Sequence, residues 1–281
     1  MRRILLTFVA VLMAVCSFAK AQREPSSFDL AKPVWSEGRE KERNLTLTFC
    51  ETVKVSRFDE ATIRLTASCD YRLRVNGEFV AHGPCVAAHD FYRIDAYDLK
   101  PYLHRGKNAI TIEVAGYNCP SYYLLDQPSF LQAEVEVDGK VVAATGRDFT
   151  AYDYGERLAD VPKFSFQRPY TEYYHLKSNH ADVKPEKLVE QGAKALLARG
   201  VAYPDYRIHK AALVDKNLYK FATNSSGFLR AKVKVKSPTT LTLRFDEILG
   251  EDGRVMARRL RWNPAVTYQL PAGEFELESF E

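Results

Sequence analysis

The stretch from Tyr71 to Val114 decides the fold, and it reads YRLRVNGEFVAHGPCVAAHDFYRIDAYDLKPYLHRGKNAITIEV. Apolar and polar residues alternate over 71–75, and Asn76-Gly77 follows at once. That order is typical of a half-buried strand that runs into a type I′ hairpin turn. Further on, the polar turn 106–108 reverses the chain into the alternating strand 109–114. Short strands joined by turns predict an all-β sandwich here rather than alternating strands and helices.

The same kind of pattern continues outward on both sides of this stretch. Strands are expected at 45–49, 61–68 and 131–137, the last turning at Asp138-Gly139 into 141–144. Within 131–137 apolar and polar residues alternate strictly, which predicts one buried face.

A helical connector is predicted between two β-rich blocks. Residues 184–199 read KPEKLVEQGAKALLAR, with apolar residues near the helical period, and Gly200 is placed to end a helix. The first sandwich domain would span 22–175, the connector 176–207 and the second sandwich domain 208–281. The second domain offers four or five strands, which do not close a sandwich comfortably.

Several motifs occur in an order that resembles a known family. The N-G hairpin, a G-P pair, an L-x-x-x-L-x-x-G-x-N segment and an apolar strand follow one another inside 71–114. The later segments QRPYTEYY at 167–174, SGFLR at 226–230 and LRFDEIL at 243–249 continue the order. Over most of 45–281 the chain resembles the N-terminal jelly-roll region of bacterial α-L-rhamnosidases and close glycosidase relatives. The resemblance implies two jelly-roll-like β-sandwich domains.

The resemblance also implies where catalysis would take place. Members of that family hydrolyse rhamnosides in a helical barrel placed after the sandwiches, with an acidic general acid and an acidic base. This chain ends in the alternating strand 275–281 with no partner strand after it, so we expect an incomplete second domain and a fragment of such an enzyme. Its partners would be that helical-barrel catalytic domain and a rhamnose-containing glycan. No catalytic residue, cofactor or metal is expected within these residues.

Residues 1–21 have the pattern of a signal peptide. Two arginines precede an apolar stretch over 4–18, and Ala19-Lys20-Ala21 gives an A-x-A cleavage site. The apolar run is shorter than the ~20 residues of a spanning helix, so a membrane anchor is the weaker alternative. Lipidation at Cys16 is a further alternative. We expect a secreted or periplasmic protein with no membrane attachment after cleavage.

The charge balance gives no sign of nucleic-acid binding. The chain has 40 basic and 36 acidic residues, and three of the basic residues lie in the predicted signal peptide. The mature chain would therefore be close to neutral, whereas nucleic-acid binding usually shows as a basic face.

Four cysteines follow the signal peptide, namely Cys50, Cys69, Cys85 and Cys119. Export permits disulfides, and four cysteines allow three pairings. A domain of this size can fold without crosslinks, so free buried thiols are an equal alternative. The absence of a C-x-x-C spacing argues against a structural zinc site.

The acidic pairs give no independent evidence of catalysis. Glycoside hydrolysis needs two carboxyl groups that flank one bond. Asp246-Glu247 lies in a predicted strand, where neighbouring residues face opposite sides, and Glu251-Asp252 lies in a predicted turn. The chain has no G-x-S-x-G motif, and His175 and His180 lack a metal-binding helical spacing.

Two segments have the mixture of aromatic and polar residues that stacks on sugar rings and bonds their hydroxyls. One loop contains Asn118, Tyr122 and Tyr123, and the other segment contains Asp90 and Tyr92. The alternative, which we weigh more heavily, is that these tyrosines cover the core or an interface with a catalytic domain.

The sequence therefore predicts the non-catalytic, accessory region of a secreted α-L-rhamnosidase-like glycosidase that acts on rhamnose-containing glycans. Two alternatives stay open, a free-standing carbohydrate-binding module and a scaffold domain without a ligand. Glycan binding by the isolated chain would favour the module, and strong association with a catalytic barrel alone would favour the scaffold.

Overall fold

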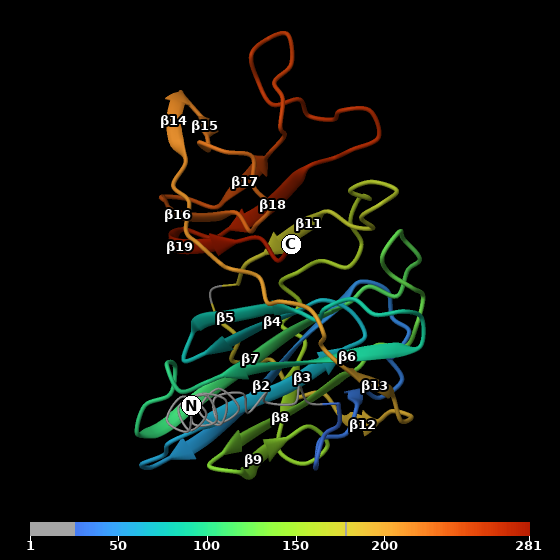
Figure 1. Cartoon of the computed structure of the whole chain (residues 1–281). Helices are drawn as coiled ribbons and strands as arrows, with labels where there is room; N and C mark the ends of the chain where they lie inside the picture. Colours follow the sequence, from blue (N-terminus) through green and yellow to red (C-terminus); the bar gives the residue numbers. More distant parts are fainter. Residues whose placement is uncertain (1–25, 178) are drawn as a thin grey trace, which may run out of the picture.

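The computed structural model describes residues 26–177 and 179–281, and the predicted signal peptide lies outside this part of the chain. The described residues form two β-rich blocks, one above the other in Figure 1. The first block holds two large sheets, and the second block holds three small ones. The all-β fold class is confirmed, whereas the jelly-roll connectivity stays a prediction.

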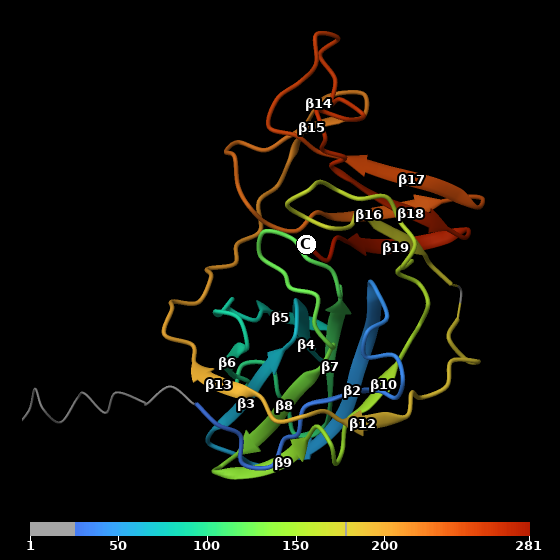
Figure 2. The ribbon, with the colours of Figure 1, turned by 90° about the vertical axis from the view of Figure 1, so that its right-hand side faces the viewer.

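The first block is a pair of sheets that face each other (Figure 2). One sheet has the order β12 (Leu188–Glu190), β1 (Val34–Ser36), β8 (Leu131–Val137), β3 (Ala61–Ala67), β6 (Phe91–Asp98) and β13 (Ala195–Ala198), with β9 (Lys140–Ala144) paired to β8. The other has the order β10 (Thr150–Tyr152), β2 (Leu45–Val55), β7 (Gly106–Gly116), β4 (Tyr71–Val75) and β5 (Glu78–Gly83).

The main core lies between these two sheets. Alternate residues of β2 and β7 point into it, and its largest fully buried side chains include Trp35, Phe49 and Tyr71. Burying a large apolar side chain contributes about 1.5–3 kcal/mol. The apolar residues that alternate along these strands therefore stabilise the first block through their burial.

The hairpin expected at Asn76-Gly77 is confirmed. It joins β4 to β5, and both turn residues have positive φ, 53° at Asn76 and 81° at Gly77. A type I′ turn requires positive φ at both central positions, which Asn and Gly adopt at low cost. The strand expected at 109–114 lies within β7 and pairs with β2 on one side and β4 on the other.

The helix predicted over 184–199 is wrong. Residues 188–190 form β12, which pairs with β1, and residues 195–198 form β13, which pairs in parallel with β6. Gly192 interrupts the apolar pattern and weakens a helix by about 1 kcal/mol. Strands β1 and β6 each offer unpaired backbone groups. The segments around the apolar pairs Leu188-Val189 and Leu196-Leu197 therefore add to the first sheet as strands instead. The predicted connector is thus part of the first block.

The chain after β13 bonds to individual backbone groups of the edge strand β5 and of β6. The Tyr206 hydroxyl accepts a hydrogen bond from the His82 amide at 3.2 Å and donates one to the His82 carbonyl at 3.1 Å. The Tyr203 hydroxyl accepts from the Ala96 amide at 2.9 Å. Backbone groups of β5 and β6 that have no strand partner on this side are therefore bonded by tyrosine side chains instead.

Strand β8 has a buried polar face as well as the predicted buried apolar face. Gln132 and Glu134 are buried because the segment before β1 covers them. The Glu134 carboxylate accepts the amides of Asp29, Leu30 and Ala31 at 2.9–3.0 Å and pairs with Arg64. The carboxylate thus fixes the start of the described chain onto the first sheet.

The second block consists of short strands, namely β11 (Glu172–His175), β14 (Ala212–Asp215), β15 (Leu218–Lys220), β16 (Arg230–Val235), β17 (Thr239–Arg244), β18 (Ala265–Leu270) and β19 (Gly273–Glu278). They pair as β11-β18-β17, β14-β15 and β16-β19. Strand β11 precedes the predicted connector in sequence, yet it runs parallel to β18. Tyr174 and Tyr268 stack in the small core of this block, with ring centres 5.0 Å apart.

Candidate functional site

An open groove lies at one end of the first block. Three segments line it: 67–70 after β3, 84–93 around the start of β6, and 123–127 in the loop after β7. The cavity between them is small, about 70 Å³, and is open to solvent. It brings together Asp90, Tyr92 and Tyr123, three of the five residues that the sequence predicts for sugar binding.

The rim of the groove is apolar and exposed. Phe91 on one side is 46% exposed and Tyr123 on the other is 39% exposed, and Val86 and Leu125 extend the rim. Exposed aromatic faces of this kind stack on the C–H groups of a sugar ring.

The polar groups of the groove are held in fixed positions. The Tyr92 hydroxyl donates to Gln127 Oε1 at 2.7 Å, and Gln127 Nε2 donates to the Ser68 carbonyl at 2.7 Å. The Tyr92 ring also packs edge-on against Phe130, and burial raises the pKa of its phenol. Asp90 is exposed, has a φ of 65°, and lies 3.1 Å from His89 Nε2. A rigid wall of this kind orients a ligand at low entropic cost.

The charged groups of the groove favour a neutral ligand over an anion. The Arg93 side chain donates to the carbonyls of Val86, Ala198 and Arg199, so its guanidinium serves the fold. Asp70 forms part of the floor, and burial raises the pKa of its carboxyl to about 6. A groove with carboxyl groups and an internally bonded arginine suits the hydroxyl groups of an uncharged sugar.

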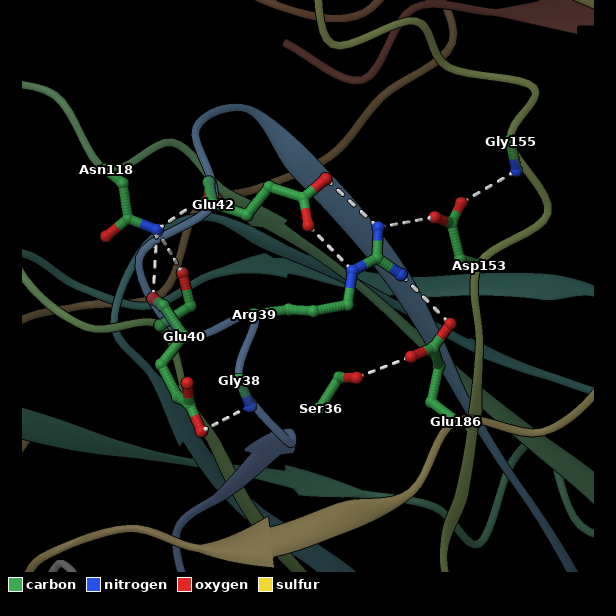
Figure 3. Close-up of polar contacts among 10 residues, drawn as sticks. Ser36, Gly38, Arg39, Glu40, Glu42, Asn118, Asp153, Gly155 and Glu186 are labelled. Atoms are coloured by element: carbon green, nitrogen blue, oxygen red, sulfur yellow. Dashed lines mark hydrogen bonds and ion pairs between the residues drawn. The ribbon is translucent and has the colours of Figure 1, made fainter.

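Tyr122 and Asn118 lie outside the lining of the groove. Tyr122 is 74% exposed and packs its ring edge-on against Phe166, with centres 5.3 Å apart. Asn118 is buried, and its Nδ2 donates to the carbonyls of Glu40 and Glu42 and to Ser129 Oγ (Figure 3). With a φ of 44°, Asn118 shapes the loop that carries the tyrosines rather than facing a ligand.

A second polar cluster lies beside Asn118 and is structural. Figure 3 shows Arg39 between three carboxylates, with 2.7 Å to Glu42 and 3.0 Å each to Asp153 and Glu186. The hydrogen bond from Arg39 lowers the pKa of the Glu42 carboxyl. Because these carboxylates use the arginine donors, the cluster joins three segments of chain and offers no anion site.

One member of each acidic pair of the second block has a structural partner. Asp246 accepts two hydrogen bonds from Arg259, at 2.7 and 2.9 Å, and this contact lowers the pKa of Asp246. Asp252 accepts the Arg254 amide at 3.0 Å within a turn. The pKa of Asp246 is thus shifted in the direction opposite to that of a general acid.

Cysteine, metal and membrane features can be described for residues 26–177 and 179–281. Within them Cys50, Cys69, Cys85 and Cys119 are free thiols, and burial raises the pKa of Cys69. In the same part of the chain no group of three His, Cys, Asp or Glu residues could hold a metal ion. None of its elements is a helix long and apolar enough to cross a bilayer.

The fold agrees with solved structures of one class of enzyme, although no family model and no curated protein matches the chain. The α-L-rhamnosidase of Aspergillus terreus superposes with a TM-score of 0.62 at 20% identity, over 88% of this chain and 32% of that one. The rhamnosidase of Bacillus sp. GL1 gives 0.57 at 19% identity, over 90% and 31%. The Streptomyces avermitilis enzyme, solved with L-rhamnose, gives 0.58 at 18% identity, over 84% and 26%.

These matches show that the chain shares the fold of part of these rhamnosidases. It spans about a third of the length of the first solved structures that it matches. The resemblance seen in the sequence is therefore confirmed at the level of the fold.

The groove could be foreseen only in part. The tyrosines and Asp90 stand out as polar and aromatic residues in turns, and that signal is in the sequence. Asp70 and Gln127 carry no such signal, because their role depends on the meeting of the turn after β3 with the loop after β7.

Proposed function

We propose that this chain is the non-catalytic, accessory region of a secreted α-L-rhamnosidase-like glycosidase, and that its groove binds a neutral, rhamnose-containing glycan. The observation that carries the proposal is the meeting of Asp90, Tyr92 and Tyr123 in one groove on a rhamnosidase-type fold. The catalytic groups of the parent enzyme would lie in a separate helical-barrel domain.

The binding mode follows from the two sides of the groove. Tyr123 and Phe91 would hold the apolar face of a sugar ring, because both rings are exposed at the rim. Asp90 would accept hydrogen bonds from sugar hydroxyls. Tyr92 and Gln127, already bonded to each other, would set the depth of the groove.

Titration calorimetry with the chain from residue 22 and methyl α-L-rhamnopyranoside tests the proposal. Tyr123→Ala and Asp90→Ala should each weaken binding at least tenfold, since each removes a direct ligand contact. Tyr219→Ala is the matched control, because Tyr219 is also an exposed tyrosine, at 61% against 39% for Tyr123, but lies on β15 in the second block. Equal affinity of all these variants, or no affinity of the unmodified chain for this glycoside and for longer rhamnose-containing oligosaccharides, would refute the binding role.

A bracing role for a catalytic domain is supported by a separate surface. All residues of β14 are exposed, and Leu213, Val214 and Tyr219 of the β14-β15 hairpin lie open to solvent. Exposed apolar surface of this kind typically packs against another domain. Gel filtration of the chain with a separately produced rhamnosidase barrel should show a complex that Leu213→Asp weakens. Co-elution that is unaffected by this change would exclude the hairpin from the contact.

A further inference from the structure

The loop that supplies one wall of the groove is held from above by the second block. Tyr122 packs on Phe166, and the Tyr123 hydroxyl donates to Glu281 Oε2 at 3.4 Å. Leu124 is buried in a cluster that includes Phe280. Figure 2 shows this loop after β7 rising toward the end marked C. Three successive residues of this loop, two of which line the groove, thus pack against elements outside the first block.

Arg168 and Glu172 organise these elements. Arg168 Nε lies 2.6 Å from Glu281 Oε2, and Arg168 Nη2 lies 3.2 Å from Glu172 Oε1. The Glu172 carboxylate also accepts the amides of Phe280 and Glu281, at 2.6 and 3.1 Å. Because Glu172 is buried, these charge-assisted bonds fix the backbone and the side chain of Glu281 together.

Phe280 connects this network to the first block. Its ring is fully buried and lies under two arginines, 5.2 Å from Arg72 and 4.7 Å from Arg157. Arg72 also donates to the Ser279 carbonyl at 3.0 Å, and Arg157 donates to the Tyr117 hydroxyl at 2.9 Å. These buried cation–π contacts hold Phe280 against the first block.

We propose that Arg168 is a positioning residue of the groove, which fixes Glu281 and thereby sets the position of the Tyr123 wall. The inference rests on the proposed glycan binding for its functional meaning. The groove is thus complete only when the second block is docked on the first. The opposite wall, 84–93, is instead held within the first block by Arg93.

Hydrogen–deuterium exchange of the chain from residue 22 tests the positioning role without any ligand. Arg168→Gln should speed exchange of amides in 119–127 at least tenfold and leave those in 84–93 unchanged. Arg168→Lys should restore part of the protection, because one ammonium can still pair with Glu281. Arg259→Gln is the matched control, since Arg259 is ion-paired in the second block but remote from the groove lining.

Phe166→Ala keeps the test decisive if Arg168→Gln disturbs folding. Phe166 is 52% exposed, so truncating it leaves no cavity in the core. Because the truncation removes the ring contact with Tyr122, it should also speed amide exchange in 119–127. Unchanged exchange of 119–127 in the folded variants would overturn the proposal, because the loop would then be held by the first block alone.

Binding of methyl α-L-rhamnopyranoside extends the test and separates the two proposals. If the unmodified chain binds, Arg168→Gln should weaken affinity at least fivefold and Arg168→Lys less. Unchanged affinity for Arg168→Gln would also overturn the positioning role. Absence of binding by the unmodified chain would refute the glycan proposal, while the exchange result would still decide the role of Arg168.

Discussion

The buried ion pair between Arg199 and Asp95 offers the sharpest test of how the first block is held together. The Asp95 side chain is fully buried and that of Arg199 is 6% exposed. Asp95 also accepts the Tyr71 hydroxyl at 2.5 Å, and Arg199 donates to the Val201 carbonyl at 2.9 Å. Arg199 follows directly after β13, so the pair fixes the segment that the sequence predicts as a helix.

Arg199→Met should destabilise the protein by about 3–5 kcal/mol, because it leaves a buried carboxylate without its partner. The double variant Asp95→Asn with Arg199→Met should lose only about 1–2 kcal/mol, since no charge is left unpaired and only ordinary hydrogen bonds are lost. The double variant should therefore be more stable than Arg199→Met by at least about 1 kcal/mol.

Urea unfolding followed by fluorescence measures both values. The chain has two tryptophans, and Trp35 is fully buried in the first block, so a Trp262→Phe background reports on that block alone. Burial raises the pKa of Asp95 above its value in the unfolded chain. Ionisation of this carboxyl therefore lowers the free energy of unfolding as the pH rises through the folded pKa. The loss in Arg199→Met should therefore be smaller at pH 5 than at pH 8. Equal unfolding midpoints for Arg199→Met and the double variant would refute the expected cost of an unpaired carboxylate at Asp95.

Three further predictions concern other buried groups. Glu134→Gln should lower the free energy of unfolding by about 3 kcal/mol, because its charged acceptor serves three backbone amides; a urea titration that shows under about 1 kcal/mol would contradict this. Gly116→Ala should cost about 1–3 kcal/mol, since a Cβ there would lie 2.5 Å from Ser129 Oγ, whereas Gly192→Ala meets no atom within 4 Å and should leave the melting temperature unchanged. Asp70→Asn should become more stable relative to the unmodified chain as the pH rises from 4 through about 6, because the raised pKa of Asp70 means that its ionisation opposes folding. Parallel pH dependence of the two unfolding midpoints would exclude that role of Asp70.

Local patterns in the sequence are sufficient to predict the strands that build the main core. The alternation over 71–75 and the Asn76-Gly77 turn specify β4, β5 and their hairpin, because both the buried face and the turn geometry are local properties. The all-β class follows from repetition of this signal.

The parts that could not be predicted depend on residues that are distant in sequence. The apolar pairs in 184–199 fit a helical period, yet the unpaired edges of β1 and β6 decide their structure. Glu134 is buried because the segment 29–31 covers it, which its own strand cannot indicate. The same holds for the groove, whose floor at Asp70 and wall at Tyr123 are separated by more than fifty residues.

The tyrosine caps on β5 and β6 also bear on how this chain behaves at high concentration. An edge strand with free amides and carbonyls recruits strands from other molecules, which is a common start of fibre formation. Here the hydroxyls of Tyr203 and Tyr206 form hydrogen bonds with backbone groups of β6 and β5 without adding another strand. These backbone groups are therefore not available to a strand of another molecule. Both caps lie on one short segment, 203–206, so a change in that segment would uncover backbone groups of both sheets at once.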